Sequence, residues 1–208
     1  MYNDLYETLE LKDFNHRGNR YYILPDSGIC VPSVTSVIYK DVDFPDTPAS
    51  RIARNRGTAV HNICESYLRN EGRKFASDGM PATLASFKKI RNEIDANLDK
   101  VRLIEGALYS KNLWTAGRVD CIGEWKNKPS IIDFKTAKNP KKEEWIRSYY
   151  IQTACYAFMF NEMFPNDSVK NLVIIVAPDH HECAQVFEMS YDKYYEEMYD
   201  IFKTKRNL

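Results

Sequence analysis

The chain has 208 residues, of which 44% are hydrophobic and 28% are charged. These values are typical of a globular protein with a hydrophobic core, and they exclude a largely disordered or low-complexity chain. Basic and acidic residues number 29 each, so the formal net charge is zero and a uniformly basic surface is excluded. A basic groove balanced by acidic residues elsewhere is compatible with this composition.

The first half of the sequence predicts a β-hairpin followed by helices. The supporting patterns are β-rich runs around a His-Arg-Gly-Asn turn cluster, a serine N-cap, and apolar residues at helical spacing. The expected elements are a hairpin over residues 8–24, a short helix over residues 34–39, a long helix over residues 49–70 and a further helix over residues 81–98. In the long helix, Ile52 and Val60 are expected to face the core, and Gly57 predicts the close approach of another backbone.

The second half predicts three successive strands, a helix, two more strands and a closing helix. Their expected ranges are 103–109, 114–125, 130–134, 143–164, 169–177, 184–189 and 191–203, with a turn over residues 127–129. This order of elements is typical of a mixed α/β (α+β) fold. We expect residues 1–208 to form a single domain. Residues 1–48 would contain the hairpin and short helix, and residues 49–208 would form its core.

The residues most indicative of catalysis follow a run of two isoleucines. Asp133 and Lys135 are two residues apart on an expected strand, so their side chains should point to the same side of it. Asp120, on the neighbouring strand, could face them. Paired carboxylates suit Mg²⁺ or Mn²⁺, and a nearby lysine can orient a water molecule and counter charge on a phosphate. The alternative is a surface ion pair, because Asp-x-Lys is common.

Two expected helices carry polar residues that could complete such a site. Tyr149, Gln152 and Tyr156 follow Trp145 at spacings of three and four, so they form one helical stripe. The alternative is a packing stripe, but a glutamine in its middle favours the wall of a polar cleft. His61, on the long helix, is a candidate metal ligand, and the alternative is a structural histidine.

Basic residues near these helices are candidates for contact with phosphate groups. The alternative for each is a solvated helix or loop surface. The candidates are Arg54, Arg56, Lys138 and Arg147.

Two other groups of potential ligands are interpreted as structural. The run Asp179-His180-His181-Glu182 falls in an expected turn, and adjacent residues rarely converge on one ion. The five cysteines include no CxxC pair, so we expect reduced thiols and no iron–sulfur cluster.

Taken in order, these motifs resemble the RecB-like branch of the PD-(D/E)XK nuclease superfamily, which includes mitochondrial and phage exonucleases. The segments that carry the resemblance are Gly57-Thr58-x-x-His61, Gly117-x-x-Asp120, Asp133-x-Lys135-Thr136 and Gln152-x-x-x-Tyr156. The resemblance implies a restriction-endonuclease-like core, with a central mixed β-sheet flanked by helices. It also implies a metal-dependent exonuclease that acts on single-stranded or end-containing DNA in replication, recombination or repair.

The resemblance further implies roles for individual residues. One or two Mg²⁺ or Mn²⁺ ions would be bound by His61, Asp120, Asp133 and the backbone carbonyl of Phe134. Lys135 would position or activate the attacking water. Gln152 and Tyr156 would brace the site and touch the DNA strand, and Tyr149 is a further candidate for contact with DNA.

Acidic residues on either side of the motifs are additional candidates. Glu105 is a candidate metal ligand, and the alternative is an exposed strand residue. Glu65, one helical turn after His61, is interpreted in the same way.

Several expectations about the protein's setting accompany this assignment. A structure-selective endonuclease of the same chemistry and a catalytically silent nucleic-acid-binding module remain as alternatives. DNA is the expected partner, together with replication or recombination proteins. No apolar run is long enough to span a bilayer, and the N-terminus lacks a basic region before an apolar run, so a cytoplasmic location is expected.

Overall fold

The structure is a computed structural model that describes residues 6, 9–71 and 80–205. The remaining residues, which include the N-terminal residues 1–5 and the start of the expected hairpin at residue 8, lie outside the described residues. The small N-terminal sheet has the order β1-β2-β3, with strands β1 (Lys12–His16), β2 (Asn19–Ile23) and β3 (Cys30–Pro32). Arg17 and Gly18 both have positive φ angles, as a two-residue hairpin turn requires. The predicted hairpin is therefore confirmed over residues 12–23.

A short helix follows the small sheet, as the sequence predicts. Helix α1 (Val34–Ile38) begins after Ser33, whose hydroxyl accepts a hydrogen bond from the backbone N–H of Ser36. Such a cap satisfies one of the backbone donors that a helix leaves free at its start.

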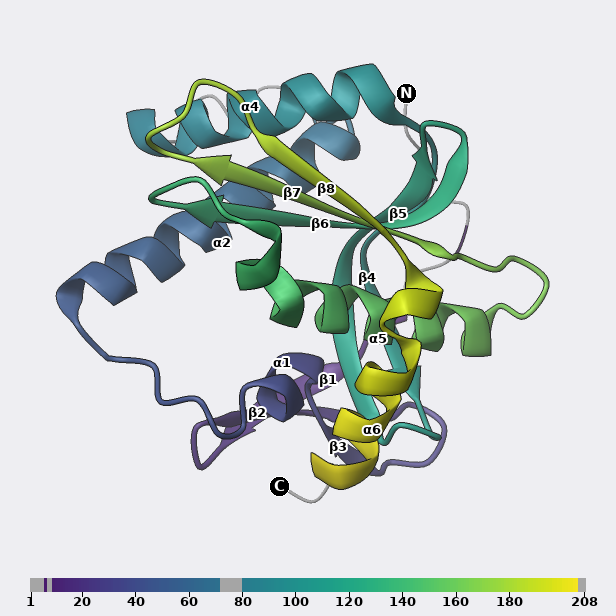
Figure 1. Ribbon diagram of the computed structural model, residues 1–208. Coiled ribbons are helices and arrows are strands. Elements are labelled where there is room, and N and C mark those ends of the chain that lie inside the picture. Colours follow the sequence, from purple (N-terminus) through teal and green to yellow (C-terminus); the bar gives the residue numbers. More distant parts are fainter. Residues whose placement is uncertain (1–5, 7–8, 72–79, 206–208) are drawn as a thin grey trace.

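The central sheet has five strands in the order β4-β5-β6-β7-β8 (Figure 1). They are β4 (Leu98–Ser110), β5 (Thr115–Trp125), β6 (Lys128–Ala137), β7 (Asn171–Pro178) and β8 (Gln185–Ser190). Only β6 and β7 run parallel, and the other neighbours are antiparallel. The mixed sheet confirms the predicted fold class.

The turn between β5 and β6 begins one residue earlier and ends two residues earlier than the sequence predicts. Lys126 and Asn127 form it, both with positive φ angles. Lys128 and Pro129 already belong to β6 and pair with β5, so the expected turn over residues 127–129 is wrong.

Helices cover both faces of the central sheet (Figure 1). Helices α2 (Pro48–Leu68) and α4 (Pro81–Asn97) pack against one face of the sheet, and their apolar side chains form one hydrophobic core with those of the strands. On the other face lie α5 (Arg147–Met163) and α6 (Tyr195–Lys205), each preceded by a short 3-10 helix, η1 (Glu143–Ile146) and η2 (Tyr191–Lys193). Neighbouring β6 residues Ile131 and Ile132 pack into opposite layers, as alternation along a strand requires.

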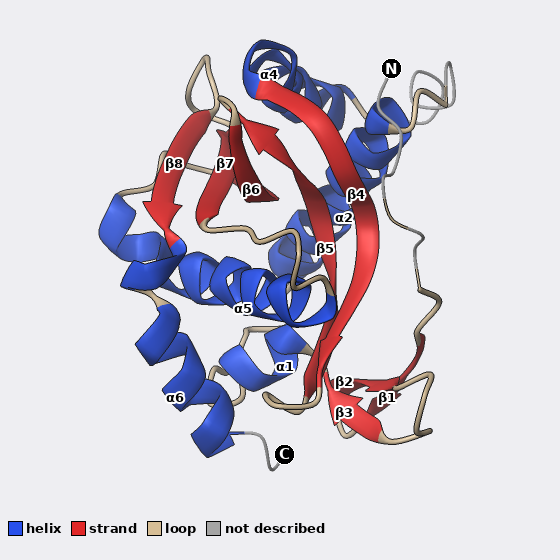
Figure 2. Cartoon of the chain, turned by 90° about the vertical axis from the view of Figure 1, so that its right-hand side faces the viewer, coloured by secondary structure: helices blue, strands red, loops and turns tan. Residues whose placement is uncertain are grey.

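Strand β5 leaves β6 at Asp120. Only residues 121–125 of β5 pair with β6, whereas β5 continues to pair with β4 back to Thr115. Strands β4 and β5 continue together to the small N-terminal sheet (Figure 2). Val119 packs into the α5 layer and Cys121 into the α2 layer, although residues two apart on a regular strand share a face. Asp120 therefore lies at the point of a fork between β5 and β6.

The beginning of α2 projects from the rest of the molecule (Figure 1). Ile52 is 69% exposed there, so its predicted place in the core is wrong, whereas Val60 is fully buried. A Cβ on Gly57 would have the Thr136 hydroxyl as its nearest neighbour, at 3.7 Å. No backbone approaches Gly57 closely within the described structure, and that expectation is also wrong.

No helix within the described ranges is long and apolar enough to cross a membrane.

Gly57→Ala should raise the free energy of unfolding by about 0.5–1 kcal/mol, because alanine is the better helix former and its methyl group has room. Urea denaturation measures the change. Gly117→Ala is the matched comparison, because its Cβ would lie 2.9 Å from the Tyr156 ring and should lower stability. A destabilised Gly57→Ala variant would show that the helix needs this glycine.

Candidate metal centre

Asp120 is held in the fork by the backbone of β6. Its Oδ2 accepts a hydrogen bond of 2.7 Å from the N–H of Phe134. Because β5 has already left β6 at this level, the side-chain carboxylate takes the place of a strand partner, which a buried N–H needs. The N–H and C=O of one strand residue point to the same edge, so the carbonyl of Phe134 also faces the fork. This orientation fits its expected role as a metal ligand.

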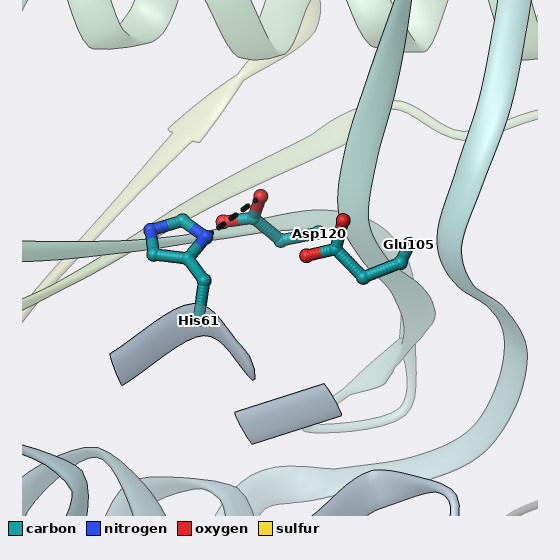
Figure 3. A group of neighbouring side chains, drawn as sticks. All are labelled: His61, Glu105 and Asp120. Atoms are coloured by element: carbon teal, nitrogen blue, oxygen red, sulfur yellow. Dashed lines mark ion pairs between the residues drawn. The ribbon is translucent and has the colours of Figure 1, made fainter. Parts of the chain in front are cut away.

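Three candidate ligands from three different elements meet beside the fork (Figure 3). His61 comes from α2, Glu105 from β4 and Asp120 from β5, and one ligand atom of each lies within 4.8 Å of the others. His61 Nδ1 is 3.2 Å from Asp120 Oδ1. Among the residues that the structure describes, this is the only group of three or more such side chains that could hold a metal ion.

Glu105 reaches this group through an unusual backbone conformation. The flanking pairs of β4 and β5, Ile104 with Cys121 and Gly106 with Val119, place Glu105 opposite Asp120. Its φ angle is 46°, a left-handed value that non-glycine residues rarely adopt. Such strain is tolerated where the surrounding structure fixes it, often at functional sites.

The charges of His61, Glu105 and Asp120 affect one another. Burial and the negative charge of Asp120 raise the pKa of Glu105 to about 8. Burial would lower the pKa of His61, but the charge and hydrogen bond of Asp120 raise it to about 9. Burial would raise the pKa of Asp120, yet the charge of His61 lowers it. When Glu105 and Asp120 are both ionised, the group has more negative than positive charge. A divalent cation would remove that excess.

Asp133 and Lys135 lie on the same side of β6, as their spacing predicts. Asp133 Oδ2 is 2.6 Å from Lys135 Nζ, and Asp133 Oδ1 accepts a 3.4 Å hydrogen bond from Gln152 Nε2. Burial raises the pKa of Asp133 to about 6, against the opposing charge of Lys135. Burial would lower the pKa of Lys135, but the charges of Asp133 and Asp120 raise it, so Lys135 is protonated.

Gln152 and Tyr156 form the α5 wall of this site. They are only 7% and 4% exposed, and Gln152 Nε2 is 3.4 Å from Tyr156 Oη. A Cβ on Gly117 would lie 2.9 Å from the Tyr156 ring. The Gly-x-x-Asp motif thus has two physical parts, because Gly117 leaves room for Tyr156 and Asp120 enters the fork. Contact of Gln152 and Tyr156 with DNA remains a prediction.

The arginines expected to contact phosphates have carboxylate partners in this structure. Arg54 pairs with Asp46 at 3.1 Å, and Arg147 pairs with Glu197 at 2.9 Å. Arg56 pairs with Asp179 at 2.8 Å. Each would have to exchange its carboxylate for a phosphate on binding DNA. Lys138 is exposed, and Tyr149 lies beneath Lys135, with its ring centroid 5.3 Å from Nζ.

The run Asp179-His180-His181-Glu182 is an exposed turn after β7. Besides the ion pair of Asp179, His181 Nδ1 lies 2.9 Å from the carbonyl oxygen of Cys183. The five cysteines are free thiols, three of them buried and two exposed. Within the described ranges, neither set forms a group of three candidate ligands.

Mn²⁺ should bind more tightly as the pH rises from about 6.5 to 8.5. Binding requires a neutral His61 and an ionised Glu105, whose pKa values of about 9 and about 8 mean that protons must leave. The affinity should rise by up to about tenfold per pH unit for each proton released. Calorimetry in buffers of different ionisation enthalpy measures that release.

His61→Gln should remove part of this pH dependence, and His180→Gln, in the exposed turn, should leave it unchanged. An affinity for Mn²⁺ that is independent of pH would contradict the assignment of these ligands.

Comparison with known proteins finds similarity to proteins named as exonucleases. No protein-family profile matches the sequence. Over 112 residues the chain is 30% identical to mitochondrial genome maintenance exonuclease 1 of Xenopus tropicalis, a match that covers 51% of this chain and only 30% of that protein. A solved structure of a Eubacterium rectale protein named as an exonuclease superposes with a TM-score of 0.51 at 13% identity, over 72% of this chain and 64% of that one. The chain is thus similar in part of its sequence to one exonuclease, and in fold to a protein named as another.

Proposed function

We propose that the chain is a metal-dependent DNA exonuclease of the RecB-like branch of the PD-(D/E)XK superfamily. The observation that carries the proposal is the fork, where His61, Glu105 and Asp120 meet beside the Asp133–Lys135 pair. The sequence similarity to an exonuclease supports it independently. Its substrate would be single-stranded DNA or DNA with free ends.

The residues at the fork fit one or two Mg²⁺ or Mn²⁺ ions. Carboxylate and carbonyl oxygens are the ligands both ions prefer, and Mn²⁺ also accepts imidazole. The proposed ligands are His61, Glu105, Asp120, Asp133 and the carbonyl of Phe134. When bound, the metal would polarise the phosphate and stabilise charge on the attacking and leaving oxygens.

Lys135 has a narrower role than the sequence alone suggests. Because Lys135 is protonated beside Asp133, it is suited to donating hydrogen bonds rather than to accepting a proton from water. We therefore assign it to positioning the attacking water and neutralising the phosphate, rather than to general base catalysis. Asp133 and the ring of Tyr149 hold its ammonium group in place.

An exposed aromatic side chain four residues before Tyr149 supports a single-stranded substrate. Trp145 is 57% exposed, and Lys142 Nζ lies 5.2 Å from its ring centroid. Tyr149 and Lys135 form a second pair of this kind. Alternating rings and cations can stack bases and contact phosphates without reading sequence.

The direct test is cleavage of end-labelled single- and double-stranded DNA with Mg²⁺ or Mn²⁺. Asp133→Asn should lower kcat at least about 100-fold, because it removes a proposed metal ligand and the partner of Lys135. Asp200→Asn, an exposed change on α6, is the matched control and should retain wild-type activity. Equal cleavage by the Asp133→Asn variant and the wild type would refute the proposal.

Closed circular single-stranded DNA separates the remaining alternatives. An end-dependent exonuclease leaves the circle intact and degrades the linear form. Cleavage of the circle would instead indicate a structure-selective endonuclease. Binding of DNA without cleavage under any metal condition would indicate a catalytically silent module.

A further inference from the structure

A polar pocket of about 400 Å³ adjoins the candidate metal centre on the side of Glu105. Glu105 belongs both to the metal group and to the wall of this pocket. The other walls come from the end of α2, from β5 and from the segment that leads into β1. The lining includes Leu11, Lys12, Glu65, Arg69 and Arg118.

Two arginines line this pocket, and they differ in their contacts with the rest of the protein. Arg69 is fixed, because its Nε lies 3.0 Å from Glu65 Oε1 and its Nη2 donates to the carbonyl of Ile104 at 2.7 Å. Arg118 is exposed and has no hydrogen bond or ion pair with any residue in the described ranges. Its guanidinium is therefore available to a ligand without breaking an existing contact.

Arg118 is placed in register with the metal centre. It lies two residues before Asp120 on β5, a span of about 7 Å along a strand, and it shares the wall of this pocket with Glu105. A DNA strand with one phosphate at the metal centre could therefore present a neighbouring phosphate to Arg118.

We propose that this pocket is a nucleotide subsite and that Arg118 binds the backbone phosphate next to the one that is cleaved. The pocket volume lies in the range of small-ligand sites, and a guanidinium binds phosphate through paired hydrogen bonds. The subsite lies beyond Glu105, whereas Lys135 and Tyr149 flank the centre from β6 and α5. This inference rests on the proposed function, because it takes the fork as the place where a DNA phosphate binds.

The test measures binding of a short single-stranded oligonucleotide in the presence of Ca²⁺. Arg118→Ala should weaken binding about tenfold or more, since it removes a charge-assisted hydrogen-bond partner. The dependence of log affinity on log salt concentration should become shallower by about 0.7, the value for one phosphate contact on a single strand. Arg118→Lys should keep the wild-type salt slope with intermediate affinity.

A scan with single neutral methylphosphonate linkages localises the contact. In the wild type, a neutral linkage should lower the affinity wherever it replaces a phosphate that the protein contacts. In Arg118→Ala, the neutral linkage should no longer lower the affinity at one of these positions. This position should be next to the position at which a neutral linkage no longer lowers the affinity of Lys135→Ala. Arg91→Ala is the matched control, because Arg91 is an exposed arginine on α4 paired with Asp95, and its scan should match the wild type.

Identical scans for the wild type and Arg118→Ala would overturn the subsite, and so would an equal change in Arg91→Ala. These outcomes are independent of the cleavage assay, so failure of the subsite and failure of the proposed nuclease activity are told apart. Thermal unfolding of Arg118→Ala should match that of the wild type, because this side chain has no described partner to lose.

Discussion

The separation of β5 from β6 at Asp120 is the constraint on which the candidate site depends. A strand that ends its pairing inside a protein leaves backbone groups without partners, and burying them unsatisfied is costly. Asp120 resolves this by accepting the N–H of Phe134 with one oxygen, while its other oxygen contacts His61. The same carboxylate therefore completes the sheet and serves as the centre of a group of ligands.

The local chemistry carries costs that the rest of the fold must offset. Glu105 has a left-handed backbone conformation, which costs of order 1–3 kcal/mol, and it is placed against another carboxylate. Two apolar layers hold this arrangement, one beneath α2 and α4 and the other beneath α5 and α6. The charges within it are balanced in part by His61 and Lys135. The packed sheet thus supports a polar site whose own charges are not fully balanced, as expected where a cation and a phosphate bind.

Sequence patterns predicted those parts of the structure that depend on local spacing. Alternation along β6 predicted that Asp133 and Lys135 lie on one side of the strand, and Gln152, from the predicted stripe on α5, contacts Asp133. The conformation of Glu105 could not be predicted, because a left-handed non-glycine residue is fixed by tertiary contacts. The reason for Gly117 was missed as well, since it depends on a ring from a helix almost forty residues later. Ile52 was misplaced because helical periodicity does not reveal where a helix projects from its sheet.

Anomalous diffraction from a crystal soaked with Mn²⁺ would show whether the fork binds a metal ion. We expect a manganese peak in the fork, within ligand distance of His61, Asp120 and the carbonyl of Phe134, that is lost in Asp120→Asn. A peak at the exposed turn over residues 179–182, or no peak in the fork under conditions in which the enzyme cleaves DNA, would contradict it.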